Sequence, residues 1–267
     1  MTRETLKCVL DTNRLPDGTV WPLPIVLQLP AGAPKDRVSP GSILVTVYGR
    51  PYAILRVTEL FNWELGDLSK RWFGTDSTDH PGVAQIKAGS EWFIAGTVSL
   101  LGNSKLPQQP LELTPIQART IFGYKHWRKV VGFHTRNVPH RAHEFLQLSA
   151  LREHHCDGIF VHPVIGPKKS GDYCGEIIVR AYDSLISHHY PANSAIVSGF
   201  WTYSRYAGPR EALFTALCRQ NFGCSHFIVG RDHTGVGDFY TADASRRFVD
   251  SLAVDIGIEP VFCDEVY

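Results

Sequence analysis

The sequence lacks several features that would assign it to a specialised class of protein. No segment approaches the roughly 18 consecutive apolar residues that a membrane-spanning helix requires. The net charge is only +1, so no strong basic field is available to attract nucleic acid. Residues 1–7 contain no apolar stretch of the signal-peptide kind. We therefore expect a cytoplasmic protein that binds neither membrane nor nucleic acid.

Cysteine is also sparse, and its spacing excludes some kinds of site. The six cysteines are scattered through both halves of the chain, and none forms a C-x-x-C pair. That spacing argues against a zinc site or a redox dithiol and is typical of a reduced, cytosolic protein. We expect no metal site formed by the protein itself.

The first part of the chain has the pattern of a β-rich domain. Short apolar runs separated by turn residues predict strands in a hairpin or small barrel, at residues 25–29, 42–48, 52–57 and 92–98. The polar, proline-containing segment 103–110 is typical of a linker. We predict a β-rich domain over residues 1–110.

The remaining residues, 111–267, alternate between strand and helix patterns. Buried-type strands are predicted at 129–133, 158–163, 195–200 and 226–230. Helices are predicted at 139–154, 172–186 and 208–221, and another begins with Thr114 as N-cap and Pro115 as its first residue. Such alternation predicts an α/β domain with a parallel sheet and crossover helices. Ligands of these sheets bind beyond the carboxyl ends of the strands.

The segment 130–144 carries the most chemical information. An apolar strand ends in a turn with Arg136 and Asn137, and a helix follows. His140 and His143 lie three residues apart at the start of that helix, so they share one face. Free backbone N–H groups and the helix dipole attract anions at this end. The segment predicts a phosphate-binding turn.

A second polar turn, residues 230–237, follows another predicted strand. Arg231 provides a second guanidinium, and Asp232 could accept a hydrogen bond from a ribose hydroxyl or orient a neighbouring histidine. No serine, cysteine or carboxylate has the pattern of an activated nucleophile. The residues favour direct displacement at phosphorus, catalysed by positioning and electrostatics.

Other polar clusters have simpler interpretations. His154–His155 and His188–His189 are predicted to be solvated pairs at helix ends. The segment 74–82 contains Asp76, Asp79 and His80, which could bind a metal, but its glycines and proline favour a hydrogen-bonded turn.

Two of these segments resemble hallmarks of the ATP sulfurylase family. The family motif Gln-Thr-Arg-Asn-Pro-x-His-Arg-Ala-His is similar to residues 134–143, and Gly-Arg-Asp-His-Ala-Gly is similar to residues 230–235. Further similar segments lie at 74–83, 162–166 and 205–212, and the resemblance extends from about Gly18 to the last residue.

The resemblance implies a PUA-like N-terminal domain followed by a Rossmann-like nucleotidyltransferase domain. It implies that a sulfate oxygen attacks the α-phosphorus of ATP in line, with Mg²⁺ accompanying the nucleotide. Adenylyl sulfate and pyrophosphate would form without a covalent enzyme intermediate. It also implies a homo-oligomer whose small-molecule partners are ATP and an oxyanion such as sulfate.

The resemblance also implies roles for individual residues. It assigns catalysis to Arg136, Asn137, His140 and His143; nucleotide binding to Thr135, Asn137, His140, His143, Gly230, Asp232, His233 and Glu265; and acceptor binding to His134, Arg136, Arg231 and Thr234.

Several positions depart from the family pattern. His134 replaces a glutamine, Thr234 replaces an alanine, and the proline of the first motif is shifted to Pro139. Relative to the family pattern, the chain is expected to be short at both ends. These departures leave two alternatives open: transfer to another oxyanion, such as a phosphonate, phosphate or carboxylate, or a non-catalytic regulatory paralogue.

Overall fold

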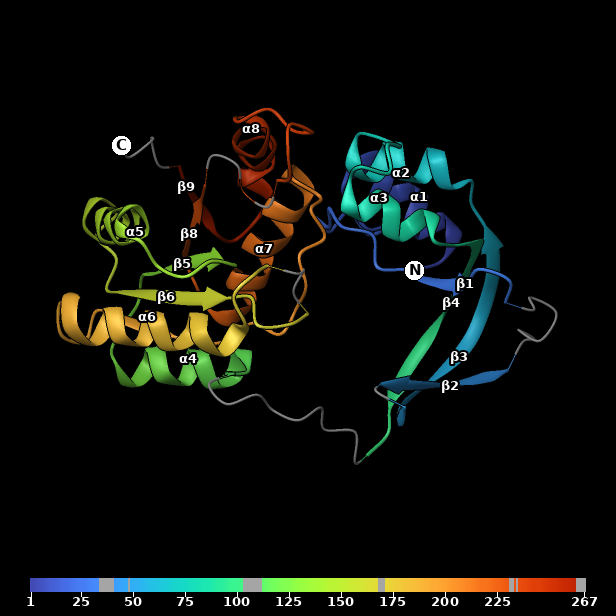
Figure 1. Ribbon diagram of the computed structural model, residues 1–267. Coiled ribbons are helices and arrows are strands. Elements are labelled where there is room, and N and C mark those ends of the chain that lie inside the picture. Colours follow the sequence, from blue (N-terminus) through green and yellow to red (C-terminus); the bar gives the residue numbers. More distant parts are fainter. Residues whose placement is uncertain are drawn as a thin grey trace. The chain divides into compact units, whose positions relative to one another are not determined.

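The chain divides into two compact units, Met1–Gln108 and Gln109–Tyr267, which are described separately. The computed structural model (Figure 1) describes residues 1–33, 41–47, 49–102, 112–167, 171–230, 233 and 235–262. The predicted linker 103–110 lies outside these residues. No helix among the described residues is long and apolar enough to cross a membrane.

The N-terminal unit contains an antiparallel sheet with the strand order β1-β4-β3-β2, which confirms the β-rich prediction. In the β2–β3 hairpin, Val47 pairs with Arg50, and Gly49 has a φ of 74°. The unit comprises α1 (Arg3–Thr12), β1 (Leu27–Pro30), β2 (Ser42–Val47), β3 (Arg50–Asn62), α2 (Leu65–Phe73), α3 (Pro81–Lys87) and β4 (Gly89–Leu100).

Three helices of this unit were not predicted, and their caps explain two of the omissions. Helix α2 is capped by Glu64, whose carboxylate accepts from the backbone N–H groups of Gly66 and Asp67. Helix α3 is capped by buried His80 and has Pro81 in its first turn. Glutamate and histidine are not among the preferred N-cap residues, so the usual start signal is missing. His80 thus belongs to a hydrogen-bonded turn, as the composition of 74–82 favoured.

The C-terminal unit is a five-stranded parallel sheet with the order β7-β6-β5-β8-β9, flanked by helices (Figure 1). This confirms the α/β prediction. Its elements are α4 (Pro115–Tyr124), β5 (Val130–Thr135), α5 (Arg141–Glu153), β6 (Gly158–Pro163), α6 (Gly175–His189), β7 (Ala195–Val197), α7 (Pro209–Phe222), β8 (His226–Val229), α8 (Ala244–Asp250), the short 3₁₀ helix Ala253–Asp255 and β9 (Glu259–Phe262).

Several boundaries differ from the predicted ones. Helix α6 begins at Gly175 rather than near residue 172, and strand β7 ends at Val197 rather than at residue 200. Helix α5 begins at Arg141, so His140 is its N-cap and not its first helical residue. Helix α4 begins as predicted, because Thr114 and Gln117 form a capping box and Pro115 follows the cap.

The strand order creates a switch point beside β5. From β5 the chain moves outward through β6 to β7, then returns to the other side of β5 to form β8 and β9. Among the described residues, β8 pairs with β5 only at Val131 and Gly132, although β5 continues to Thr135. The carboxyl ends of β5 and β8 therefore separate, which is where doubly wound sheets bind ligands.

The core of this unit supports that arrangement. Strands β5, β6 and β8 are buried over nearly their whole length, as expected for a parallel sheet covered on both faces. Their apolar side chains pack against Tyr182 of α6 and Ala150 of α5 in one buried cluster. The residues that follow the strands are therefore held by a rigid base.

Candidate active site

A cavity of about 300 Å³ lies at the carboxyl ends of β5 and β8. It therefore occupies the crevice that the strand order creates. The cavity is lined by Phe133, His134, Thr135, Arg136, Asn137, His143, Leu146, Ser204, Ile228, Gly230 and His233.

The turn after β5 is shaped by its own side chains. Thr135 is buried, and its hydroxyl accepts a hydrogen bond from the backbone N–H of Asn137 at 3.1 Å. This local bond folds the chain tightly after the strand. The guanidinium of Arg136 lies over the ring of Tyr206, 5.2 Å from its centre. Both Arg136 and Asn137 face the cavity as a result.

A buried carboxylate fixes the segment that carries Tyr206. Glu211, only 2% exposed, accepts hydrogen bonds from the backbone N–H groups of Arg205 and Ala207. Burial raises the pKa of this carboxyl, while those bonds oppose the rise. Tyr206 has a positive φ of 58°, which costs energy for a residue with a side chain. Glu211 thus holds a strained turn against Arg136.

His140 and His143 lie together at the start of α5. Their ring centres are 3.8 Å apart, and the rings are inclined by 30°. His140 caps the helix without a side-chain hydrogen bond, so no side chain closes the first turn in the usual way. His143 contacts the edge of Phe133, and its Nδ1 lies 3.0 Å from the hydroxyl of Tyr182.

His143 is a neutral imidazole at ordinary pH. Burial lowers its pKa to about 4, and the neighbouring His140 contributes in the same direction. A neutral imidazole has one ring nitrogen as a donor and the other as an acceptor. His143 can therefore donate one hydrogen bond without first binding a proton, and a hydrogen bond to the backbone of Val138 opposes the lowering of its pKa.

His134 is oriented by a buried arginine. Arg219 is fully buried and donates from Nη2 to His134 Nδ1 and to the carbonyl of His162, each at 2.8 Å. Burial lowers the pKa of Arg219 to about 10, so the guanidinium stays charged at neutral pH. Because a guanidinium cannot accept, His134 Nδ1 must be the acceptor, and the neutral ring carries its proton on Nε2.

Gly132 makes room for this arginine. A Cβ atom added to Gly132 would lie 2.8 Å from the Cγ of Arg219 and 3.2 Å from the sulfur of Cys224. A larger residue in the middle of β5 would therefore displace the arginine that orients His134. The glycine in an otherwise apolar strand marks a close approach between α7 and the sheet.

His233 faces His134 across the cavity. The two rings stack with their centres 5.4 Å apart. The backbone N–H of Gly230 donates to His233 Nδ1, and His233 Nε2 lies 3.0 Å from the hydroxyl of Thr215, which donates to the carbonyl of Ala212. Burial lowers the pKa of His233 to about 3, with the charge of Arg219 adding to the effect. His233 is therefore neutral and serves as part of the cavity wall.

The structure brings together seven of the residues singled out in the sequence. His134, Thr135, Arg136, Asn137, His143, Gly230 and His233 line one cavity, and His140 lies beside His143. The remaining predicted residues, Arg231, Asp232, Thr234 and Glu265, lie outside the described residues. Sequence reasoning missed Arg219, Tyr206 and Tyr182, and the isolated glycine in β5 was the only signal for the first of them.

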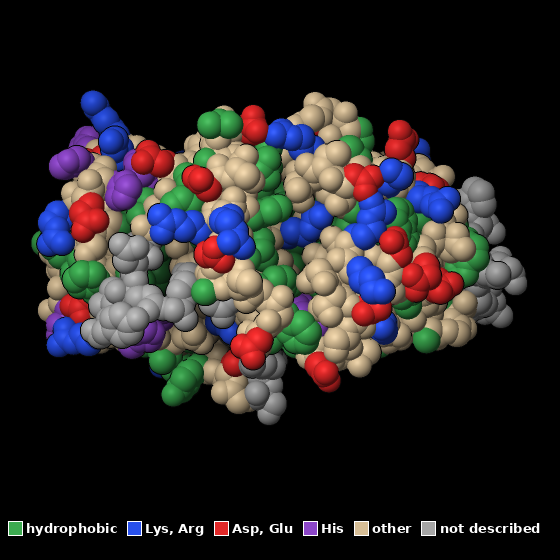
Figure 2. Space-filling view, turned by 90° about the horizontal axis from the view of Figure 1, so that it is seen from above, with side chains coloured by type: hydrophobic (Ala, Val, Ile, Leu, Met, Phe, Trp, Pro, Cys, Tyr) green, Lys and Arg blue, Asp and Glu red, His purple; other side chains and the backbone are tan. Residues whose placement is uncertain are grey.

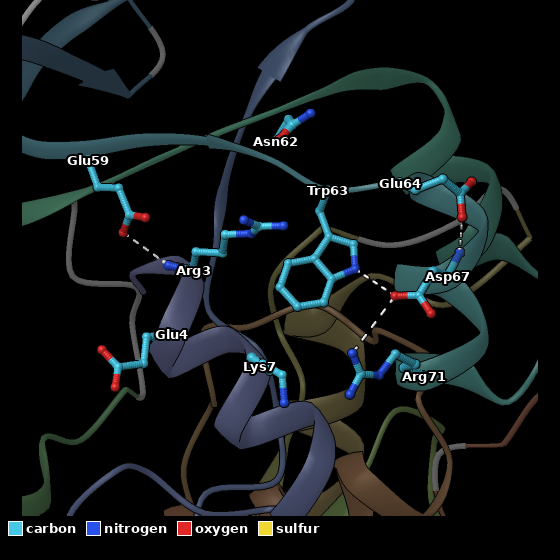
Figure 3. Close-up of a pocket in the computed structure, with 9 residues that line it drawn as sticks. All are labelled: Arg3, Glu4, Lys7, Glu59, Asn62, Trp63, Glu64, Asp67 and Arg71. Carbon is cyan, nitrogen blue, oxygen red and sulfur yellow. Dashed lines mark hydrogen bonds and ion pairs between the residues drawn. The ribbon is translucent and has the colours of Figure 1, made fainter.

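A larger cavity, of about 790 Å³, lies in the N-terminal unit. Figure 3 shows its centre at Trp63, whose Nε1 donates to Asp67. Cations and carboxylates alternate around the indole: Arg3, Lys7 and Arg71 face Glu4, Glu59, Glu64 and Asp67. Its charges are balanced locally, so the cavity does not offer a coherent site for an anion.

Comparison with known proteins gives a consistent result. Residues 109–267 match the family model described as ATP-sulfurylase, and residues 1–103 match that of a PUA-like domain. The second match begins at residue 1, earlier than the resemblance at Gly18 predicted.

Two curated relatives cover the whole chain. A sulfate adenylyltransferase of Staphylothermus marinus is 40% identical over 100% of this chain and 69% of its own length. One of Pyrococcus abyssi is 39% identical with the same coverage of both. The hexameric APS kinase from Thiobacillus denitrificans has a TM-score of 0.72 at 23% identity, over 99% of this chain and 46% of that chain. This structural likeness shows the fold.

Proposed function

The chain belongs to the ATP-sulfurylase family and is a nucleotidyltransferase, and we propose that it forms adenylyl sulfate and pyrophosphate from ATP and sulfate. One observation carries this proposal. Arg136, His134 and His143 face a single cavity, and its described lining contains no carboxylate. A cavity lined by imidazole and amide donors and a guanidinium favours oxyanions.

The start of α5 is suited to the phosphates of ATP. The free N–H groups of its first turn and the positive end of the helix dipole attract negative charge. His140 and His143 lie at this end, and Asn137 and Thr135 belong to the turn before it. We assign the triphosphate to this side of the cavity, where neutral His143 donates to oxygens on which charge accumulates in the transition state.

The acceptor is assigned to the side of His134 and Arg136. Because Arg219 donates to Nδ1 of His134, the proton of the neutral ring is on Nε2, and we assign that N–H to the acceptor side. Such a donor resembles the side-chain amide of the glutamine in the family motif. Arg136 supplies charge for a tetrahedral oxyanion. Arg231 and Thr234 are proposed to complete this side.

The chemistry requires no nucleophile from the protein. An oxygen of sulfate attacks the α-phosphorus, and the bond from that phosphorus to the oxygen bridging to the β-phosphate breaks. Pyrophosphate leaves with the electron pair of that bond. The residues contribute alignment of the two anions and stabilisation of the charge at phosphorus.

A divalent cation, proposed to be Mg²⁺, would accompany ATP. Since the described lining of the cavity has no carboxylate, phosphate oxygens and water would provide most of its ligands, as Mg²⁺ often prefers. When bound, it would neutralise part of the triphosphate charge. The residues near the cavity would hold the complex through its phosphates.

A second candidate acceptor is another oxyanion, favoured by the replacement of glutamine with His134. The test is pyrophosphate release from MgATP with sulfate, molybdate, phosphate or a small phosphonate. Release that depends on sulfate or molybdate supports the proposal. Pyrophosphate release only with phosphate or phosphonate would show that one of these anions, and not sulfate, is the acceptor. ATP binding without release in any assay would favour the regulatory paralogue.

A further inference from the structure

A cluster of possible metal ligands lies at the amino ends of the parallel strands, and the proposed active site lies at their carboxyl ends. His154, His226 and Glu259 each offer a ligand atom, and these atoms lie within 4.8 Å of one another. His226 Nε2 is 3.2 Å from Glu259 Oε2, and His154 Nδ1 is 3.6 Å from Glu259 Oε1. In Figure 2, histidine side chains gather at this end of the C-terminal unit.

The fold holds these three side chains in place. His226 and Glu259 are the first residues of the adjacent parallel strands β8 and β9 and are direct partners in their register. His154 is the C-cap of α5, the helix that returns from the carboxyl end of β5 to the start of β6. Both histidine rings meet edge to face, with centres 5.5 Å apart. His154 ends the helix and stays partly exposed, as the sequence predicted, but its ring also contacts His226 and Glu259.

A neighbouring hydroxyl orients the most buried ligand. His226 is 5% exposed, and its Nδ1 lies 2.8 Å from Ser225 Oγ. Ser225 Oγ accepts from the backbone N–H of Val130 and can donate to the carbonyl of the same residue. A ring that donates from Nδ1 to this hydroxyl directs the Nε2 lone pair toward Glu259. Metal-binding histidines commonly use such an outer hydrogen bond.

We propose that His154, His226 and Glu259 bind a divalent transition-metal ion, Zn²⁺ being the best match, and that this ion joins the end of α5 to the start of β8 and β9. Two histidines and a carboxylate form a ligand set typical of Zn²⁺. With bonds of about 2.0–2.1 Å, tetrahedral ligands lie about 3.3 Å apart. The distances from the two histidines to the Glu259 carboxylate, 3.2 Å to Oε2 and 3.6 Å to Oε1, are of this order.

The proposed ion has a structural role. It lies at the amino edge of the sheet, where residues in α/β folds usually support stability rather than chemistry. It would anchor the last residue of the helix whose first turn carries His143. The proposal does not depend on the reaction assigned to the cavity, because its test measures metal binding and unfolding.

The test uses the whole chain, treated with chelator and then titrated with Zn²⁺ by calorimetry. Wild type should bind one ion at this site, and Co²⁺ should give the visible absorption of a tetrahedral complex. Glu259→Gln and His154→Gln each remove one ligand and should weaken binding about tenfold or more. His226→Asn is a third variant, and the first two keep the test valid if that buried change prevents folding.

The matched control is His188→Gln, at the exposed pair ending α6, which should leave the affinity unchanged. Zn²⁺ should also raise the Tm of wild type and of His188→Gln but not that of Glu259→Gln. Full affinity in both Glu259→Gln and His154→Gln would overturn the proposal, because the ion would then bind elsewhere, for example at His140 and His143. The absence of any Zn²⁺ binding by wild type would also overturn it.

Discussion

The cavity around Trp63 and the cavity at the end of β5 differ in size and in the charges that line them. The first, in the N-terminal unit, is about 790 Å³, and the second, in the C-terminal unit, is about 300 Å³. In the larger one, Lys7 forms an ion pair with Asp11, and Arg71 forms ion pairs with Asp11 and Asp67. In the smaller one, the described lining contains Arg136 and histidines but no carboxylate.

The proposed site is therefore the smaller cavity, chosen by its lining residues and not by its volume. An anion is attracted by an uncompensated field, and paired charges around a cavity cancel at short range. The smaller cavity also lies at a switch point, where the fold separates two strands. The charges of the lining residues and the strand order therefore both favour the smaller cavity as the anion site. The following experiments test the roles of its residues.

The largest effect is expected for His143→Ala. If His143 donates to the phosphates as charge accumulates, its removal should lower kcat about a hundredfold or more. Steady-state pyrophosphate release at saturating ATP and sulfate measures this change. His188→Ala, at the exposed end of α6, is the control and should keep full activity. An unchanged kcat for His143→Ala would exclude His143 from catalysis.

The next effect concerns stability at low pH. The pKa of His233 is lowered to about 3 from its ordinary value of 6.5, so the native state binds its proton less readily than the unfolded state. The contribution of neutral His233 to the free energy of unfolding is complete above pH 6.5 and is lost as the pH falls toward 3. At about 1.36 kcal/mol per pH unit, the loss between pH 6.5 and pH 5 is about 2 kcal/mol.

Urea unfolding at pH 7 and pH 5 tests this, with His233→Gln as the matched variant. Glutamine can still donate to Thr215, but it does not titrate. The variant should lose less stability than wild type over this range. Some carboxylates of the N-terminal unit, such as Glu64 and Asp76, also have lowered pKa values. They stabilise the native state above the ordinary pKa of a carboxyl group and lose this effect only in stronger acid. Equal losses in wild type and variant would contradict the account of His233.

A smaller effect is expected for His134→Gln. Both side chains can place one N–H donor in the cavity, so the KM for sulfate should change by less than about tenfold. The KM for ATP should stay nearly constant, because the triphosphate is assigned to the start of α5. Kinetics with each substrate varied in turn separate the two constants. A change in the KM for ATP alone would contradict this assignment and would place His134 in the nucleotide-binding part of the cavity.

The sequence predicted the C-terminal fold well for a physical reason. Buried parallel strands have continuous apolar runs, and β5, β6 and β8 all show them. Helices α1, α2 and α3 were missed, and length alone does not explain this, because α1 is as long as α4. Two of them, α2 and α3, also begin at unusual caps, Glu64 and His80. Local preference is weak in such short segments, and packing decides their structure.

The site was predictable only where its residues are contiguous in sequence. The turn from His134 to His143 could be recognised as an anion-binding segment, and the structure brings its residues to one cavity, while their roles remain predictions. Arg219 could not be recognised, because nothing in the pattern of α7 distinguishes an inward guanidinium from a solvated one. The same applies to His226 and Glu259, whose proximity depends on the register of β8 and β9.

The most direct test of the central claim compares two arginines, one from each cavity. Sulfate-dependent pyrophosphate release from MgATP is measured for Arg136→Met and for Arg3→Met, beside wild type. The account predicts a loss of about a hundredfold or more in kcat/KM for sulfate in Arg136→Met and wild-type activity in Arg3→Met. Full activity in Arg136→Met together with loss in Arg3→Met would contradict it and would assign the oxyanion to the larger cavity.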